Sequence, residues 1–308
     1  MATQVARRAA ISDMFALIER KWGNFEALFD RSLRVERCHE LKHESLERLF
    51  THQTLALVVP NFVEKTLLEP LASRLVAKAV KYRTNWQISS NRGLESSDVL
   101  VPVGTPFNVA VAKKSVDEYF DDGVPRATKM LRELSGGGAS IIDVLRCDLD
   151  AAWRGGATRL RDDGGRAHHA ALPRVMVGPT KWLNGYVHVD DLAPLSPFAG
   201  LFSANVYLRL PPVGGELELW PCGFWNRIQF YRNASALSDL VTLNDPDAQK
   251  RLRQRLGAAT LVEPKRGDLV LLSVQRPHAV RGFQNGHRVS VQSFIHHDGP
   301  TRPLKMEA

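Results

Sequence analysis

The stretch KRGDLVLLSVQRPHAVRGFQNGHRVSVQSFI, residues 265–295, gives the clearest indication of the fold. It contains two apolar runs, Leu269–Ser273 and Val289–Ile295, that have the length and composition of buried β-strands. A Pro-Lys-Arg-Gly-Asp turn at 264–268 precedes the first run, and a Gln-Asn-Gly turn at 284–286 precedes the second. The stretch therefore predicts β structure with tight turns rather than helix.

Further short runs of the same texture occur upstream, separated by turns such as PPVGG at 211–215. They are Arg174–Val177, Tyr186–Val189, Asn205–Leu210, Glu216–Trp220 and Thr260–Val262. No helices alternate with these runs, which argues against a parallel α/β sheet. Many short strands with Gly, Pro and Asn turns are typical of an all-β sandwich or barrel. One helix, from about Asp245 to Leu256, is expected as an insertion.

The N-terminal half reads as mainly helical, and we divide the chain at residue 53. Residues 1–53 are a helical extension, because apolar side chains recur there at steps of three and four. This stripe consists of Ile11, Met14, Phe15, Ile18, Trp22 and Phe25. We expect the extension to pack on the main domain or on a second subunit, as the contact of a homodimer. Residues 54–308 form the main domain, whose β core lies mainly at 173–297.

Between residues 54 and 172 the local signals predict a series of simple elements. The apolar run Leu55–Val59 predicts a buried strand, and Thr66 with Glu69 resembles a capping box that opens a helix to about Tyr82. The remaining expectations are an irregular segment or lid at 84–110, helices at 115–134 and 140–153 joined by a flexible Gly-rich link, and a polar loop at 154–171 with His168 and His169 exposed.

Composition limits the classes of function. The net charge is +8 and the pI is near 9.6, but the basic residues are scattered among acidic ones. We expect a solvated basic surface rather than a nucleic-acid interface, and an anionic small molecule is compatible with it. Cys38, Cys147 and Cys222 form no CxxC pair, which favours a reducing cytosol. No run of about 18 apolar residues occurs, so no membrane span is expected. A cytoplasmic location follows.

The residues with the clearest chemistry are in the β half. In the run Gly185–Asp190, His188 and Asp190 alternate, so both point to one face if the run is a strand. A third ligand from another strand would complete a metal site, and His278 is the candidate. Two histidines and one carboxylate leave three positions open on an octahedral metal, which is the arrangement for non-haem Fe(II).

Arg288 and Ser290 strengthen this interpretation. They follow His278 by ten and twelve residues and share one face of the predicted strand. A guanidinium and a hydroxyl pointing inward offer a charge-assisted clamp for a carboxylate. Each residue alone has an ordinary explanation, since His278 can be a turn histidine and Arg288 a surface arginine. Their combination on successive strands is the more specific signal.

The order His-X-Asp, distal His and Arg-X-Ser resembles the 2-oxoglutarate/Fe(II)-dependent dioxygenase superfamily. Residues 203–220 and 265–295 resemble the bacterial N-acyl amino-acid hydroxylases and carrier-protein-independent aliphatic halogenases of that superfamily. The likeness extends over about 54–297, weakly before residue 173. It implies an α+β fold with a double-stranded β-helix (jelly-roll or cupin-like) core and packed N-terminal helices.

The resemblance also implies the chemistry. Fe(II) would be bound by His188, Asp190 and His278, and 2-oxoglutarate by Arg288 with help from Ser290. O2 would be the oxidant, and ascorbate an activator. The reaction would oxidise an unactivated C–H bond of a small amino-acid-like or natural-product substrate, by hydroxylation, cyclisation or desaturation, and release succinate and CO2. The related halogenases carry Gly where Asp190 stands, so halogenation is disfavoured.

Other residues are candidates of lower rank. Asn205 and Tyr207 share a strand face and are expected to contact cosubstrate or substrate, or to belong to the core. The aromatic side chains of Trp220, Phe224 and Trp225 could line the substrate side or cover the barrel mouth. Arg281 could meet an anionic substrate group or lie on the surface. His287 should face away from Arg288, and His296 and His297 are expected to be exposed.

Two alternatives remain open from the sequence. The first is a cupin-like metal protein, an isomerase or a ligand-binding module, that does not use 2-oxoglutarate. Such a protein has no need of Arg288 and Ser290. The second is a nucleic-acid demethylase, which would need a basic groove beside the iron.

Overall fold

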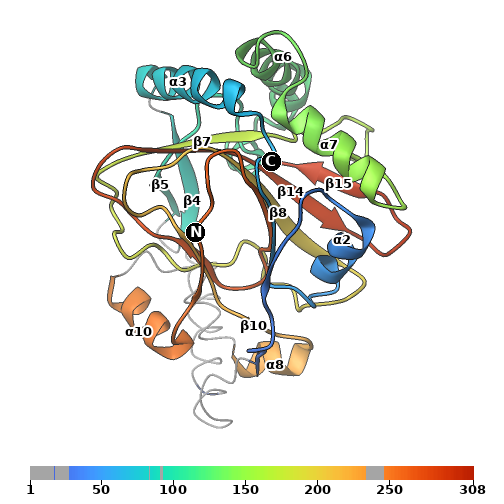
Figure 1. The fold of residues 1–308 in the computed structure, drawn as a ribbon, viewed down its shortest axis with the longest axis vertical. Coiled ribbons are helices and arrows are strands. Elements are labelled where there is room, and N and C mark those ends of the chain that lie inside the picture. The colour runs from blue at the N-terminus through green and yellow to red at the C-terminus, as the bar shows by residue number, and fades with distance from the viewer. Residues whose placement is uncertain (1–16, 18–27, 83, 91–92, 234–245) are drawn as a thin grey trace.

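The computed structural model describes residues 17, 28–82, 84–90, 93–233 and 246–308. Two facing β-sheets form its centre, and helices lie along the outer face of the larger one (Figure 1). The larger sheet has the order β2 (Val35–Arg37), β3 (Ala56–Val59), β12 (Leu269–Ser273), β8 (Gly200–Arg209), β14 (His287–His297), β7 (Leu172–Val177), β5 (Gly93–Leu100) and β4 (Asn85–Ser90). In addition, β15 (Leu304–Glu307) pairs with β14 and with β6 (Ala157–Arg159), and β1 (Leu28–Phe29) pairs with β10 (Cys222–Gly223).

The smaller sheet has the order β11 (Thr260–Val262), β9 (Leu217–Leu219) and β13 (His278–Val280), and a single bridge from His188 to His278 extends it. From β7 onward the chain passes from the larger sheet to the 188 segment, back to β8, then to β9 and β11, to β12, to β13 and finally to β14. This alternation between two sheets is the topology of a jelly roll or double-stranded β-helix. The expected fold class is therefore confirmed.

Strand alternation gives the larger sheet two different faces. Outward residues such as Val206, Leu271 and Val291 are apolar and pack against the helices. Inward residues of the same strands include Val270 and Tyr207, which belong to the core between the sheets. Beside this inner core, the inward positions of β7, β8 and β14 carry polar side chains. Polar residues inside a barrel need hydrogen-bond partners or a ligand. We therefore expect a ligand-binding site at this end of the interior.

The helices form one layer over the larger sheet. This layer contains α2 (His43–Phe50), α3 (Lys65–Tyr82), α6 (Val124–Leu134) and α7 (Ile141–Ala152), whose buried residues join the outer core. Shorter helical segments lie beside α6: α4 (Phe107–Ala112), α5 (Val116–Glu118) and the π-helix η1 (Tyr119–Gly123). In Figure 1, α8 (Arg227–Arg232) and α10 (Pro246–Leu256) lie at the opposite end of the molecule.

Several local expectations are confirmed. The run 55–59 is β3, the helix expected over 66–82 is α3, and the expected insertion helix is α10. Helices also occupy 116–134 and 141–152, and residues 135–140 link them. The second of these helices begins with a capping box, in which the Ser140 side chain accepts from the Asp143 backbone and Asp143 accepts from the Ser140 backbone.

Other expectations are wrong. Residues 28–41, expected to be helical, contain the strands β1 and β2, and β2 pairs in parallel with β3. Residues 84–110, expected to be irregular, contain the hairpin of β4 and β5. The hairpin joins the larger sheet only where Val99 and Leu100 pair with β7. Most of the hairpin therefore lies beyond its pairing with β7, and its sequence shows no sustained alternation of apolar and polar residues. The apolar stripe between Ile11 and Phe25 lies outside the described residues. The domain boundary at 53 and the homodimer contact stay predictions.

Three histidines that were expected to be exposed are buried. Relative exposures are 4% for His168, 2% for His169 and 1% for His297. Aromatic side chains from distant segments surround two of them: Phe107 and Phe120 contact the His168 ring, and Phe50 stacks on the His297 ring. The residues next to these histidines in the sequence did not indicate that they are buried, because the aromatic side chains that cover them belong to other helices.

Burial of histidines makes acid stability a testable property. Burial lowers the pKa of both His52 and His169 to about 3. The folded protein therefore binds fewer protons than the unfolded chain between about pH 6.5 and 3, and stability falls as the pH falls through this window. At pH 5.5 each residue should cost about 1.4 kcal/mol of unfolding free energy relative to neutral pH. Urea unfolding at pH 7 and 5.5 should show this loss, and His169→Gln should reduce it by about 1.4 kcal/mol. An unchanged loss in the variant would contradict the prediction.

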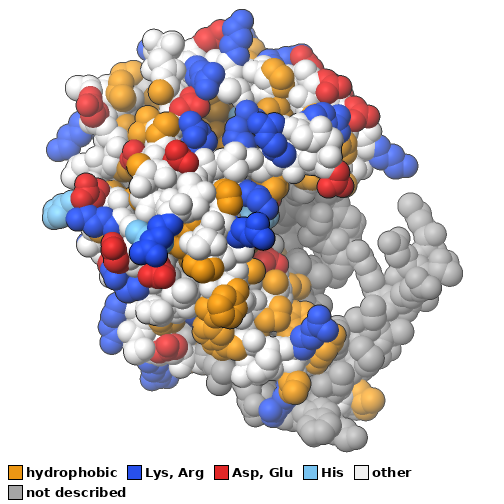
Figure 2. Space-filling model, turned by 90° about the vertical axis from the view of Figure 1, so that its right-hand side faces the viewer, with side chains coloured by type: hydrophobic (Ala, Val, Ile, Leu, Met, Phe, Trp, Pro, Cys, Tyr) orange, Lys and Arg blue, Asp and Glu red, His pale blue; other side chains and the backbone are white. Residues whose placement is uncertain are grey.

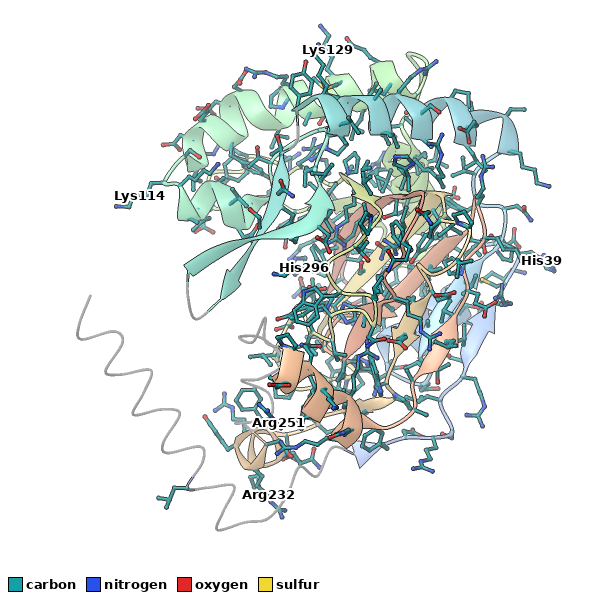
Figure 3. The ribbon with its side chains drawn as sticks, turned by 90° about the vertical axis from the view of Figure 1, so that its left-hand side faces the viewer. His39, Lys114, Lys129, Arg232, Arg251 and His296 are labelled. Atoms are coloured by element: carbon teal, nitrogen blue, oxygen red, sulfur yellow. The ribbon has the colours of Figure 1, made fainter. Side chains whose placement is uncertain are left out.

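The basic charge is spread over the described surface. Figure 2 shows lysine and arginine side chains interspersed with acidic ones on one face. In Figure 3, Lys114 and Lys129 lie at the helical layer, whereas Arg232 and Arg251 lie at the far end of the molecule. No helix among the described residues is long and apolar enough to cross a membrane.

Candidate metal centre

The side chains of His188, Asp190 and His278 converge at one end of the barrel interior. One ligand atom from each residue lies within 4.8 Å of those of the other two. His188 Nε2 is 3.7 Å from Asp190 Oδ1, and His278 Nε2 is 3.4 Å from Asp190 Oδ2. The two imidazole rings are 4.3 Å apart between centroids. The structure thus brings together the three residues that the sequence nominated.

Hydrogen bonds fix which ring nitrogen faces the centre. His188 Nδ1 donates to the Tyr186 carbonyl at 3.0 Å, and His278 Nδ1 donates to the Arg276 carbonyl at 2.9 Å. Each Nδ1 therefore carries the proton, and each Nε2 presents its lone pair toward Asp190. Histidines that bind metals are oriented in this way by a bond from the other nitrogen.

The electrostatics of the three groups fit a cation between them. Burial, and after it the neighbouring His278, lowers the pKa of His188 to about 4, so its imidazole is neutral at pH 7. Burial opposes ionisation of Asp190, but the facing His278 and His188 side chains outweigh it and lower its pKa. Two lone pairs and a carboxylate therefore face one another, and a metal ion is what such a donor set accommodates.

The backbone positions the two histidines. His188 N–H donates to the His278 carbonyl at 3.0 Å, and His278 N–H donates to the His188 carbonyl at 2.9 Å. This reciprocal pair places the two side chains on the same face of the smaller sheet. Asp190 N–H donates to the Val274 carbonyl at 3.0 Å. Of the strand expected over Tyr186–Val189, only the bridge between His188 and His278 is present.

A side chain replaces the missing outer strand. Gln249 of α10 accepts from Val187 N–H at 2.7 Å and donates to the Val187 carbonyl at 3.0 Å. Its amide thus satisfies both backbone groups of the residue before His188, as a neighbouring strand would. Gln249 is buried and lies 62 residues from Val187 in sequence, so the segment gave no local sign of it.

We expect Gln249→Leu to weaken the metal centre without touching a ligand. The substitution leaves two buried backbone groups of Val187 unpaired, each at a cost of about 1–3 kcal/mol. Loss of such a supporting contact typically lowers metal affinity by about 10- to 100-fold. Anaerobic Fe(II) titration and thermal unfolding measure the two effects. Gln254→Leu, the same change at an exposed position of the same helix, is the control and should alter neither. Equal metal affinity in the two variants would contradict this role.

A cavity of about 360 Å³ leads from the metal centre into the barrel. It is lined by both histidines and Asp190, by inward residues of β7, β8 and β14, and by β5 of the hairpin. Figure 3 shows that hairpin projecting beside the helical layer. The segment expected to be a lid therefore contributes one wall of the cavity, as a paired hairpin.

Arg288 lies in this cavity, where no carboxylate of the described residues pairs with its charge. It is 5% exposed, its guanidinium donates to the Tyr207 hydroxyl at 3.3 Å, and its Nε has no partner among the described residues. Tyr207 and Asn205 also line the cavity, and the Asn205 amide donates to Ser203 Oγ. Ser290 has an exposure of 0%, and its Oγ has no partner in the described part of the chain. A carboxylate ligand would satisfy Arg288.

Other candidates lie elsewhere. Trp220 and Phe224 pack in a separate core with α10, Trp225 is largely exposed, and none of the three lines the cavity. Arg281 forms an ion pair with Glu218 at 3.0 Å and does not line the cavity. His287 lies on β14 without facing the cavity, as expected.

The structure adds two residues that sequence reasoning missed, Trp86 and Arg174. Both line the cavity, and the Arg174 guanidinium lies 4.1 Å from the centre of the Trp86 ring. The predicted strand 174–177 begins with Arg174. An arginine on a strand of the barrel could have indicated a positive charge in the barrel interior. Trp86 carried no such signal, because the segment around it was not expected to be a strand.

Comparison with known proteins found no matching family model and no matching curated protein. Among solved structures, the chain is similar to an N-substituted L-amino acid dioxygenase from Burkholderia ambifaria AMMD, at 14% identity over 86% of this chain and 91% of that one, with a TM-score of 0.49.

The chain is also similar to an oxidoreductase of the 2OG-Fe(II) oxygenase family from Burkholderia pseudomallei, at 13% identity over 89% and 99% of the two chains, with a TM-score of 0.35. A third is a Trichoplax adhaerens prolyl hydroxylase in complex with a peptide fragment, at 14% identity over 83% and 90%, with a TM-score of 0.38.

Proposed function

We propose that this protein is an Fe(II)- and 2-oxoglutarate-dependent oxygenase that oxidises a C–H bond of a small, amino-acid-like substrate. One observation carries the proposal. Two imidazole lone pairs and a carboxylate converge at one end of a cavity whose interior also contains an arginine with no carboxylate partner among the described residues. A metal ion would occupy the donor cluster, and an anionic cosubstrate would pair with the arginine.

The residues have separate tasks. His188, Asp190 and His278 would hold the ion and leave its remaining positions facing the cavity. Arg288, supported by the Tyr207 hydroxyl, would bind the far carboxylate of 2-oxoglutarate, and Ser290, two residues further along β14, would assist it. Bound iron and 2-oxoglutarate would supply the oxidising power, by activating O2 as 2-oxoglutarate is converted to succinate and CO2.

The cavity supports a small substrate. A volume of about 360 Å³ lies at the lower end of the range for small-molecule sites. Apolar side chains of Leu217, Leu272 and Val280 line it together with the polar groups. Such walls hold an apolar carbon chain and exclude water from the reacting C–H bond. Product masses distinguish hydroxylation, which adds one oxygen, from cyclisation or desaturation, which removes two hydrogens.

The test uses two steps. Anaerobic addition of Fe(II) and 2-oxoglutarate should produce the visible charge-transfer absorption of the chelate, which reports cosubstrate at the iron. Admission of air with ascorbate should then yield succinate. A screen of amino acids and their acylated forms should reveal compounds that stimulate succinate formation and gain one oxygen or lose two hydrogens.

The main competing function is a cupin-like metal protein that does not use 2-oxoglutarate. Such a protein would bind Fe(II) but give neither the absorption nor succinate, and that outcome would replace the proposal. A nucleic-acid demethylase would instead show succinate formation stimulated by methylated oligonucleotides and weakened by salt.

A further inference from the structure

A second cation in the cavity has no role in the functions assigned so far. Arg174 on β7 is half-buried, its Nε has no hydrogen-bond partner, and no carboxylate pairs with it in the described part of the chain. Its guanidinium rests on Trp86 of β4, at 4.1 Å from the ring centre. Burial lowers the pKa of Arg174 to about 10, so the side chain is still charged at neutral pH.

Arg174 and Arg288 occupy different places along the cavity. In the pairing of β7 with β14, Arg174 lies opposite Ser290, whereas Arg288 lies opposite Met176. Arg174 lines the same cavity as His188 and Asp190, and its charge lowers the pKa of both, while the charge of Arg288 in turn lowers the pKa of Arg174. Arg288 is instead bonded to Tyr207. The two arginines therefore lie at different positions along the cavity, with Arg288 at the start of β14 and Arg174 opposite Ser290, two residues further along that strand.

The charge of the cavity calls for one more anion. Apart from its histidines, the described residues that line the cavity include three cations, Arg174, Lys181 and Arg288, and two carboxylates, Asp98 and Asp190. A divalent metal and the two carboxylates of 2-oxoglutarate cancel each other, so these described groups keep one net positive charge. A substrate with a single carboxylate removes it, and charge complementarity of this kind favours such a ligand over a neutral one.

We propose that Arg174, stacked on Trp86, binds the carboxylate of the substrate that is oxidised, and that this substrate is a small organic acid with an apolar body. The inference rests on the proposed function and names the chemical class of its substrate. The stack holds the guanidinium plane in place, and a planar guanidinium binds a carboxylate through two parallel hydrogen bonds. Met176, Leu217 and Val280 line the same cavity and would contact the apolar body. Arg281, the sequence candidate for this role, is already paired with Glu218.

The test compares acids with their amides. Anaerobic protein that holds Fe(II) and 2-oxoglutarate is titrated by calorimetry with hexanoate, N-acetyl-L-valine and N-acetyl-L-leucine, and with the carboxamide of each. At least one acid should bind about 10- to 100-fold more tightly than its amide, because the amide loses a charge-assisted hydrogen-bond pair. Arg174→Gln should bring the affinity for that acid down to that for the amide, and Arg174→Lys should give an intermediate value, since lysine keeps the charge but not the paired geometry.

Two controls separate this role from others. Arg281→Gln removes an arginine outside the cavity, whose partner Glu218 remains paired with Arg253 at 2.7 Å, and should leave the preference for the acid unchanged. The visible absorption of the iron–2-oxoglutarate chelate should appear at the same 2-oxoglutarate concentration in Arg174→Gln as in the unmodified protein. That readout also shows that the variant is folded.

Several results would overturn the inference. It fails if the unmodified protein forms the chelate but binds acids and amides equally, or binds no acid at millimolar concentration. It also fails if Arg174→Gln still prefers the acid, or if the variant needs about 10-fold more 2-oxoglutarate to form the chelate, since Arg174 would then serve the cosubstrate. An absence of the chelate in the unmodified protein would refute the proposed function itself, and this inference with it.

Discussion

His278→Ala should lower the affinity of the protein for Fe(II) by at least about 100-fold, which exceeds the usual effect of losing a supporting contact. The imidazole is one of the two nitrogen donors in the cluster, and its loss leaves His188 and Asp190 as a two-ligand site. Succinate formation should fall with metal occupancy. Anaerobic titration with Fe(II), and with Co(II) as a spectroscopic substitute, measures the loss directly.

His287→Ala is the matched control, because it removes a histidine nine residues further along that does not line the cavity. It should leave Fe(II) affinity and succinate formation unchanged. Unaltered turnover in His278→Ala would refute the assignment of the ligands. Equal losses in both variants would indicate a general effect on the fold instead.

Arg288→Gln should raise the concentration of 2-oxoglutarate needed for half-maximal chelate formation by about 10- to 100-fold. The substitution removes the only cation that the Tyr207 hydroxyl contacts in the described structure, and it leaves a shorter, uncharged polar side chain. Fe(II) affinity should not change, because Arg288 contacts none of the three metal ligands. A lower affinity for 2-oxoglutarate together with an unchanged affinity for Fe(II) would identify Arg288 as a residue that binds the cosubstrate.

Arg209→Gln provides the comparison for Arg288. Arg209 lies on the neighbouring strand β8 and pairs with Glu69 outside the cavity, so its loss should not affect 2-oxoglutarate. Tyr207→Phe should cause a smaller increase than Arg288→Gln, since it removes one neutral hydrogen-bond partner. If Arg288→Gln bound 2-oxoglutarate normally, the proposed clamp would be wrong.

The sequence predicted the fold where local pattern and tertiary position agree. In β12, Leu269 and Leu271 face the helices while Val270 and Leu272 face the interior, so the whole strand is apolar and easily recognised. The strand β14 carried a second signal, since Arg288 and Ser290 alternate with Val289 and Val291. These runs lie in the middle of the larger sheet, where both faces are covered and the pattern is strongest.

Predictions from the sequence were wrong where distant segments of the chain supply the contacts of a residue. His168 and His169 end a polar loop, and the aromatic side chains that bury them belong to residues 107–120. The hairpin of β4 and β5 is rich in serine, and it joins the larger sheet where Val99 and Leu100 pair with β7. Local propensity does not contain such information.

The metal centre shows both cases. His188 and Asp190 were found from their spacing, although the strand that justified the spacing is a single bridge. Their common direction comes from the backbone pair with His278 and from the Gln249 amide. The sequence thus nominated three residues that the structure brings together, while the contacts that hold them could not be read from it.

The reciprocal pairing of His188 with His278 has a consequence for which metal the protein carries. Because peptide groups and the two Nδ1 bonds set the positions of the donors, the polypeptide rather than the ion dictates their arrangement. Two imidazoles and a carboxylate fixed in this way bind Ni(II), Cu(II) and Zn(II) more tightly than Fe(II) by the general order of divalent affinities. Selection of iron then falls to supply in the cell, and protein purified without added iron and a reductant would be mismetallated and inert.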